Sequence, residues 1–462
     1  MEEISTNKRE MWSNRWLFVL AAAGSAVGLG NIWKFPYIAG ENGGGAFVLI
    51  YLACIALVGV PIMMAEILIG RAGRASPIAS MQKLSEQASA SRNWKLVGWL
   101  GVIAGFLILS YYAVIAGWAL NYVWISGAGS LTGISAERAE TIFNDFLSSP
   151  WELLFWHSLF MIFTISIVAR GIGRGLETAV RWFMPLLFVL LVTLLIYGFQ
   201  SGGFDQAFDF MFDFKFDVIS TETWLIALGQ AFFTLSLGMG AMMAYGSYVP
   251  SSANIGSTVL TIALLDSFVA IASGLAIFPI VFANGLEPGQ GPGLMFVTVP
   301  LAFGQMTFGS LFGTLFFLLV SFAAITSAIS LTEPAISYLV EKYNASRARV
   351  AISLGVFCWM LGIGTVLSFN LWAEMTVLGK TFFDAVDYLS QNIMLPLGGL
   401  LIAFFAAWRI PGAIISEQLN TNDARWLIFW KLLAGVIAPL AVALVFLNTL
   451  FPGIFQILGG LL

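Results

Sequence analysis

Stretches of about 20 consecutive apolar residues recur along the whole chain, and they constrain its fold more than any other feature. A stretch of this length is long enough to cross a lipid bilayer as a helix. Hydrophobic residues make up 59% of the 462 residues and charged residues only 10%, which excludes an ordinary soluble globular protein. The sequence therefore predicts an all-α integral membrane protein surrounded by the lipid bilayer.

Eleven such segments are expected to cross the membrane. Their expected ranges are 15–38, 43–70, 96–125, 151–170, 180–199, 223–248, 255–284, 308–340, 350–368, 381–407 and 426–450. No hydrophilic block separates soluble domains, so residues 1–462 are predicted to form a single transmembrane domain. The apolar, proline-containing segment 285–308 is predicted to fold as a cap on the outer face.

The distribution of basic residues predicts how the helices are oriented. With the N-terminus in the cytoplasm, 16 of the 21 lysine and arginine residues fall on the inner side, in agreement with the positive-inside rule. An odd number of spans then places the C-terminus outside. The net charge of −4 is spread over loops and gives no reason to expect a nucleic-acid partner.

The first span is interrupted near its middle by Gly24, Gly28 and Gly30. Each glycine inside a helix costs about 1 kcal/mol relative to alanine. Close packing of another helix against these small residues would explain them. The sixth span, however, has a similar interruption at residues 236–240. Paired interruptions five spans apart indicate two repeats, 15–199 and 223–407, with 426–450 as an additional helix, and they favour a transport site at the membrane midplane.

Polar residues in two other spans indicate what the interrupted segments would hold. Asp266 lies in the seventh span, and Thr326 and Ser327 lie in the eighth. An ionisable residue inside an apolar span is costly and usually functional, and oxygen ligands suit a small hard cation. Glu66 in the second span is expected to have a structural role instead, bonding the unwound part of span one or span six.

At these residues the chain resembles the neurotransmitter:sodium symporter family, in particular its bacterial eleven-span amino-acid transporters. The matching stretches are residues 24–37, 41–47, 111–112, 230–240, 323–327 and 383–387. The resemblance implies a 5+5 inverted repeat with discontinuous helices 1 and 6. It also implies sodium-coupled symport of an amino acid by alternating access, in a bacterial inner (cell) membrane.

The resemblance implies two sodium sites as the only cofactors. The first would use Ala26, Asn31, Thr234, Asp266 and the substrate carboxylate, and the second would use Gly24, Val27, Ala323, Thr326 and Ser327. Many animal relatives have asparagine at the position of Asp266 and bind chloride nearby. A fixed carboxylate can supply that negative charge, so we expect transport without chloride. A proton on Asp266 could replace sodium on the return step, which would give proton antiport.

The resemblance also implies where the substrate binds. Tyr112 would donate to the substrate carboxylate beside the backbone of Gly28 and Gly30. The ammonium would meet carbonyl groups around Ala26, Phe233, Thr234 and Ser236, and the side-chain pocket would be lined by Leu29, Ile108, Phe233, Met239, Ala324, Ser327 and Leu331. This pocket is apolar and has no acidic side chain, which favours hydrophobic or aromatic L-amino acids.

Residues at both ends of the pathway are implied to act as gates. Phe233 would form the outer lid, with Lys34 and Asp387 as a charged pair beyond it, where the family usually has arginine in place of lysine. At the inner end the gate residues would be Arg9, Trp12, Tyr248 and Glu341. Gly175 and Pro185 would allow the fifth span to unwind locally, although a simple proline kink is the alternative.

Other classes of function remain as alternatives. A proton-coupled amino-acid transporter would need no sodium sites. A membrane-embedded enzyme would need a nucleophile, a base or a metal cluster, but the only histidine is His157 and no catalytic motif is present. A channel would not need the paired gates. The sequence does not predict an oligomeric state.

Overall fold

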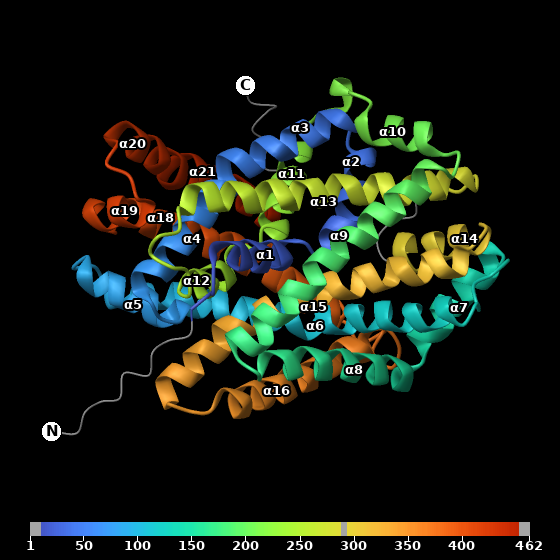
Figure 1. Cartoon of the computed structure of the whole chain (residues 1–462), viewed down its shortest axis with the longest axis horizontal. Helices are drawn as coiled ribbons and strands as arrows, with labels where there is room; N and C mark the ends of the chain where they lie inside the picture. Colours follow the sequence, from blue (N-terminus) through green and yellow to red (C-terminus); the bar gives the residue numbers. More distant parts are fainter. Residues whose placement is uncertain (1–10, 288–292, 452–462) are drawn as a thin grey trace.

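The computed structural model describes residues 11–287 and 293–451. In this part of the chain the regular structure is helical, apart from two isolated β-bridges. Figure 1 shows the long helices α6 (Lys95–Gly127), α8 (Pro150–Val168), α13 (Ile255–Ala283) and α15 (Gly309–Tyr343) running in roughly the same direction. The protein is therefore a helical bundle, as the apolar segments predict.

The first half of the chain contains α1 to α9. Besides α6 and α8, its helices are α1 (Arg15–Ala26), η1 (Gly30–Lys34), α2 (Phe35–Glu41), α3 (Gly45–Cys54), η2 (Ile55–Gly59), α4 (Val60–Gly73), α5 (Pro77–Gln87), η3 (Arg92–Trp94), α7 (Ala136–Ser148), η4 (Ile172–Glu177) and α9 (Thr178–Phe199).

The second half contains α10 to α21. Besides α13 and α15, its helices are α10 (Phe204–Phe212), η5 (Phe216–Val218), α11 (Thr221–Thr234), α12 (Ala241–Gly246), η6 (Leu294–Thr298), α14 (Val299–Gly304), α16 (Arg347–Ser368), α17 (Phe382–Asp387), η7 (Tyr388–Met394), α18 (Leu395–Trp408), α19 (Gly412–Leu419), α20 (Ala424–Leu432), η8 (Leu433–Ile437) and α21 (Ala438–Leu450).

Both expected interruptions are present. Among the described residues, nine helices are long and apolar enough to cross a membrane, and a tenth span is bent by 71° between Arg15–Ala26 and Gly30–Glu41. The sixth expected span does not form one helix, because residues 235–240 separate α11 from the short α12. Discontinuous first and sixth spans are thus confirmed, and this division of span six accounts for the difference from eleven continuous helices.

The break in span six has a clear local cause. Gly238 and Gly240 have φ values of 80° and 74°, and Ser236 has 54°, a left-handed conformation that glycine adopts without steric cost. The freed N–H of Gly238 donates to Glu66 Oε1 at 2.7 Å. The structural role expected for Glu66 is therefore confirmed, since its buried carboxylate satisfies a backbone group that unwinding leaves without a helical partner.

The remaining expectations for the fold concern two segments. Residues 294–304 of the expected cap form η6 and α14, which are largely buried and contact α7 at one end of the bundle (Figure 1). At the start of the fifth span, Gly175 lies in the π-helical turn η4, and Pro185 lies inside the helix α9. The helix continues through both positions, with a wider turn at its beginning.

Candidate functional site

A small cavity lies where the two interrupted spans meet. Its volume is about 30 Å³, close to the volume that one water molecule takes up in the liquid. Eleven of the thirteen residues predicted to bind substrate line it, namely Ala26, Gly28, Leu29, Gly30, Ile108, Tyr112, Phe233, Ser236, Met239, Ser327 and Leu331. Thr234 and Ala324 do not line it, whereas Ser25 and Ser330, which the sequence reasoning missed, do.

One hydrogen-bond donor in this cavity is free to meet a ligand. The hydroxyl group of Tyr112 is buried and has no hydrogen-bond partner among the described residues. A Cβ atom on Gly28 would lie 3.2 Å from this hydroxyl oxygen and 2.9 Å from Ser327 Oγ. A larger residue at position 28 would therefore close the space around the hydroxyl group.

The first predicted cation site is a cluster of side chains around Asp266. The Asp266 carboxylate is fully buried and accepts hydrogen bonds from Asn31 Nδ2 at 2.7 Å and from Thr234 Oγ1 at 2.9 and 3.0 Å. The hydroxyl group of Tyr51 contacts its other oxygen at 3.4 Å. Neutral donors stabilise this carboxylate, and its negative charge remains available to a cation.

The second predicted cation site lies where α1 contacts α15. Ser327 Oγ is 3.3 Å from the carbonyl oxygens of both Gly24 and Val27. Thr326 Oγ1 is 3.0 Å from the carbonyl oxygen of Ala323, and a Cβ atom on Gly24 would lie 3.1 Å from Thr326 Cβ. The structure thus brings together the five predicted residues, and the small size of Gly24 permits the close approach of α15.

The oxygen atoms in both clusters are suitable ligands for a hard cation. No group of three or more histidine, cysteine, aspartate or glutamate side chains that could hold a metal ion occurs among the described residues. A cation at either cluster would be held by the carbonyl, hydroxyl and amide oxygens described above, with Asp266 as the one carboxylate. Such a ligand set suits sodium better than a transition metal.

At the end predicted to face outside, Phe233 lines both the cavity and a larger chamber of about 300 Å³. Lys34 Nζ lies 5.1 Å from the centre of the Phe233 ring. The predicted partner Asp387 instead accepts a hydrogen bond from Gln391 Nε2. Within the described part of the chain, neither Lys34 nor Asp387 forms an ion pair, so the predicted outer pair is not in direct contact here.

At the inner end, Trp12 is buried. Its indole N–H donates to the Tyr245 carbonyl oxygen at 3.2 Å, and its backbone N–H donates to the Tyr248 carbonyl oxygen at 3.1 Å. The Glu341 carboxylate accepts the N–H of Ser76 at 2.9 and 3.1 Å. Arg9 lies outside the described residues. The structure therefore brings Trp12 and Tyr248 together as expected.

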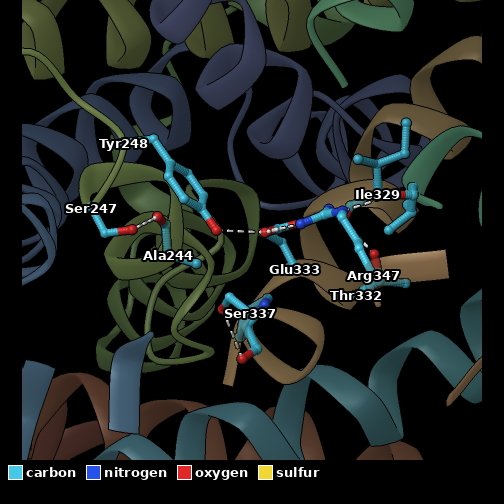
Figure 2. A network of polar contacts seen from close by, with 10 residues as sticks. Ala244, Ser247, Tyr248, Ile329, Thr332, Glu333, Ser337 and Arg347 are labelled. Carbon is cyan, nitrogen blue, oxygen red and sulfur yellow. Dashed lines mark hydrogen bonds and ion pairs between the residues drawn. The ribbon is translucent and has the colours of Figure 1, made fainter. Parts of the chain in front are cut away.

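The side chain of Tyr248 contacts a buried acid that the sequence does not single out. Figure 2 shows its hydroxyl group donating to Glu333, which also pairs with Arg347. The distance from the Tyr248 hydroxyl oxygen to Glu333 Oε1 is 2.8 Å, and Glu333 is fully buried. Arg347 is anchored further because its Nε donates to the Val168 carbonyl oxygen at 2.9 Å.

Comparison with known proteins identifies the family. The model of the sodium:neurotransmitter symporter family matches residues 9–144 and 140–453. This chain belongs to the sodium:neurotransmitter symporter family. As a multi-pass symporter it is a carrier and not an enzyme, so the enzyme alternative is excluded on the grounds of family membership.

Its relatives among bacteria and archaea share its full length. An uncharacterized sodium-dependent transporter of Bacillus subtilis (strain 168) is 38% identical over 448 residues, which cover 96% of this chain and 98% of the relative. One from Methanocaldococcus jannaschii is 32% identical, covering 96% and 91%. The crystal structure of MhsT in complex with L-phenylalanine superposes with a TM-score of 0.88 at 44% identity, covering 96% of this chain and 100% of that one.

Two contacts of this symporter were missed by the sequence reasoning. Glu333 and Arg347 form the buried pair in α15 and α16, and Glu177 accepts both the N–H and the hydroxyl group of Ser13 at 2.6 Å. Both acids lie in or beside apolar segments, where an ionisable residue is usually functional. An ionisable residue inside an apolar segment is also the pattern that indicates a role for Glu66 and Asp266, and it indicates one for Glu333 in the same way.

Proposed function

We propose that this symporter imports hydrophobic or aromatic L-amino acids into the cell, driven by sodium and independently of chloride, through alternating access. One observation carries the proposal. The Tyr112 hydroxyl group has no hydrogen-bond partner in the described structure and lines the cavity at the break between α1 and η1, and Asn31, just after this break, donates to the buried carboxylate of Asp266. A donor and a cation site at the same helix break suit an amino acid that binds together with sodium.

The lining of the cavity supports an apolar substrate. Leu29, Ile108, Met239 and Leu331 line it, and it has no acidic side chain, which disfavours amines that lack a carboxylate. The cavity is narrow, and the flexible thioether of Met239 can adapt its shape to the side chain of the substrate. The L-phenylalanine bound to MhsT supports an aromatic substrate.

Sodium is assigned to both clusters. In the first site, Asn31, Thr234 and Asp266 would act with the Ala26 carbonyl group and the substrate carboxylate. In the second site, the ligands would be Gly24, Val27, Ala323, Thr326 and Ser327. Sharing of the first sodium ion by substrate and protein would couple amino-acid binding to sodium binding, because each ligand raises the affinity for the other.

A second candidate function is proton-coupled transport. Asp266 is buried without a basic partner within the described structure, so it could carry a proton on one part of the cycle and be neutral there. Sodium symport with proton antiport would use the same protonation of Asp266. Both mechanisms need Asp266, but only proton-coupled transport needs no sodium.

The gates and the topology complete the proposal. The transporter would lie in the cell (inner) membrane with its N-terminus in the cytoplasm and its C-terminus outside, built from repeats over 15–199 and 223–407. Trp12, Tyr248 and Glu341, together with Arg9, would close the inner end. Unwinding between Gly175 and Pro185 would open a path from the cytoplasm to the second sodium site, since glycine and proline both weaken helical bonding.

The experiment that tests the proposal is uptake of radiolabelled tryptophan and leucine into proteoliposomes under an inward sodium gradient, in chloride or in gluconate. Sodium-driven uptake that is equal in both anions supports it. Uptake that follows a proton gradient without sodium favours the second candidate, and absence of amino-acid uptake under either gradient contradicts both.

Replacing Tyr112 by phenylalanine is expected to raise KM for the amino acid by about tenfold with a smaller effect on kcat, because the substrate carboxylate loses one hydrogen bond to a charged group. Initial rates of uptake at varied amino-acid concentration measure this. Replacing Tyr122, which is also buried but does not line the cavity, by phenylalanine is the matched control. An unchanged KM in Tyr112→Phe would contradict the assigned role.

A further inference from the structure

We propose that Gln391 is a positioning residue of the outer gate, which holds Asp387 apart from Lys34 until the gate closes. This inference rests on the proposed function together with the predicted outer gate, which Lys34 and Asp387 would form. Gln391 is four residues after Asp387, and residues four apart share one face of a helix. The two residues meet where α17 passes into the π-helical segment η7, and such wide turns are frequent at functional sites.

Gln391 is fixed by two contacts of its amide nitrogen. Its Nε2 donates to Asp387 Oδ1 and also to the hydroxyl oxygen of Tyr111, at 3.1 Å in the second case. Tyr111 is buried in α6 and also contacts Ser390 Oγ at 3.5 Å. The amide group thus ties Asp387 to a buried residue of a neighbouring long helix, and the carboxylate already has a donor in this conformation.

Lys34 is held on the opposite side. Its ammonium group lies over the Phe233 ring at 5.1 Å, in the range of a cation–π interaction. Lys34, Phe233 and Gln391 all line the 300 Å³ chamber. Each charge of the gate therefore has a neutral partner of its own: an aromatic ring for Lys34 and an amide group for Asp387.

Because of these two contacts, the gate between Lys34 and Asp387 closes only after one of them is released. Two opposite full charges attract each other more strongly than a charge attracts a neutral amide group or ring at a similar distance, so the pair forms once one of the contacts is released. Phe233 also lines the substrate cavity, and its movement over a bound substrate would free Lys34. Gln391 then determines how readily Asp387 leaves its position to meet the lysine.

The test measures how accessible the chamber is from outside. Ile226 lines the chamber, and the two natural cysteines, Cys54 and Cys358, are buried, so Ile226→Cys gives a single reporter for a membrane-impermeant maleimide. Without its amide donor, Gln391→Met is expected to let the gate close more readily and to slow labelling by about three- to tenfold, the effect of one hydrogen bond. The measurement is made in proteoliposomes with sodium and no substrate.

A double-mutant cycle separates positioning from a merely structural role. In an Asp387→Asn background the ion pair cannot form, so Gln391→Met is expected to leave the labelling rate unchanged. An equal slowing in both backgrounds, or no slowing in either, overturns the inference. If Gln391→Met does not fold, Tyr111→Phe removes the second contact of the same amide group and is expected to slow labelling in the same way.

A different result is expected if Lys34 and Asp387 do not form the outer gate at all. If Lys34→Ala and Asp387→Asn each leave labelling and sodium-driven uptake unchanged, the proposed gate is wrong and the role of Gln391 is excluded with it. If these two substitutions change labelling but Gln391→Met and Tyr111→Phe do not, the gate stands and only the role of Gln391 is excluded.

Discussion

Asp266→Asn is expected to lower sodium-driven amino-acid uptake by about 10- to 100-fold, the effect of losing one contact to a charged group. Asparagine has nearly the same shape but no negative charge. Its amide oxygen can still accept from Asn31 Nδ2 and Thr234 Oγ1, which both donate to Oδ1 of the present carboxylate, so the loss of charge is the main change. The proposed first sodium site would then lose its only charged protein ligand, and the affinity for a cation decreases when the ligands carry less negative charge.

The measurement is uptake into proteoliposomes over a range of sodium concentrations, in chloride and in gluconate. Loss of uptake in gluconate with partial recovery in chloride would support the view that the carboxylate replaces a bound anion. Asp209→Asn is the matched control, since this aspartate is exposed on α10. Unchanged sodium dependence in Asp266→Asn would contradict both the site and the coupling assigned to it.

Glu333→Gln is expected to lower the free energy of unfolding by about 3 kcal/mol, because it leaves the guanidinium group of Arg347 without its counter-charge. The value is at the low end of the range for buried pairs, since the Arg347 side chain keeps 18% of its surface exposed while that of Glu333 is fully buried. The hydroxyl group of Tyr248 also loses a charged acceptor. We therefore expect the inner end to open more easily and uptake to fall.

Thermal unfolding in detergent, followed together with uptake, checks this prediction. The double substitution Glu333→Gln with Arg347→Gln removes both charges and is expected to recover part of the lost stability. Glu86→Gln is the control, because Glu86 pairs with Arg92 on the surface and exposed pairs contribute about 1 kcal/mol or less. A Glu333→Gln protein as stable as the control would show that the pair does not hold the inner end together.

Local sequence patterns predicted the fold and most of the central site. Apolar segments can only cross a bilayer as helices, because the backbone must satisfy its hydrogen bonds internally, and the glycines of spans one and six show where that rule is broken. The matching stretches then predicted cation-site residues that do lie together, such as Asn31 with Asp266 and Gly24 with Thr326. One member of each pair, Asn31 or Gly24, lies at the interruption of span one, and the matching stretches include this interruption.

The gate contacts could not be predicted in the same way. Arg347 counts in the sequence only as one basic residue of an inner loop, and nothing local indicates that Glu333 contacts both Arg347 and Tyr248. Gln391 likewise gives no signal in its own segment, yet it contacts Tyr111 from a helix 280 positions earlier in the chain.

The sequence by itself determined the membrane-spanning helices, their two interruptions and the residue types at the central site, because hydrophobic length and backbone freedom are local properties. Only the tertiary structure decided which charged and polar side chains pair at the two ends: Glu333 with Arg347, Glu177 with Ser13, and Gln391 with Asp387 and Tyr111. Most of these partners come from different helices, and a buried polar group is satisfied by whichever partner packing places within reach.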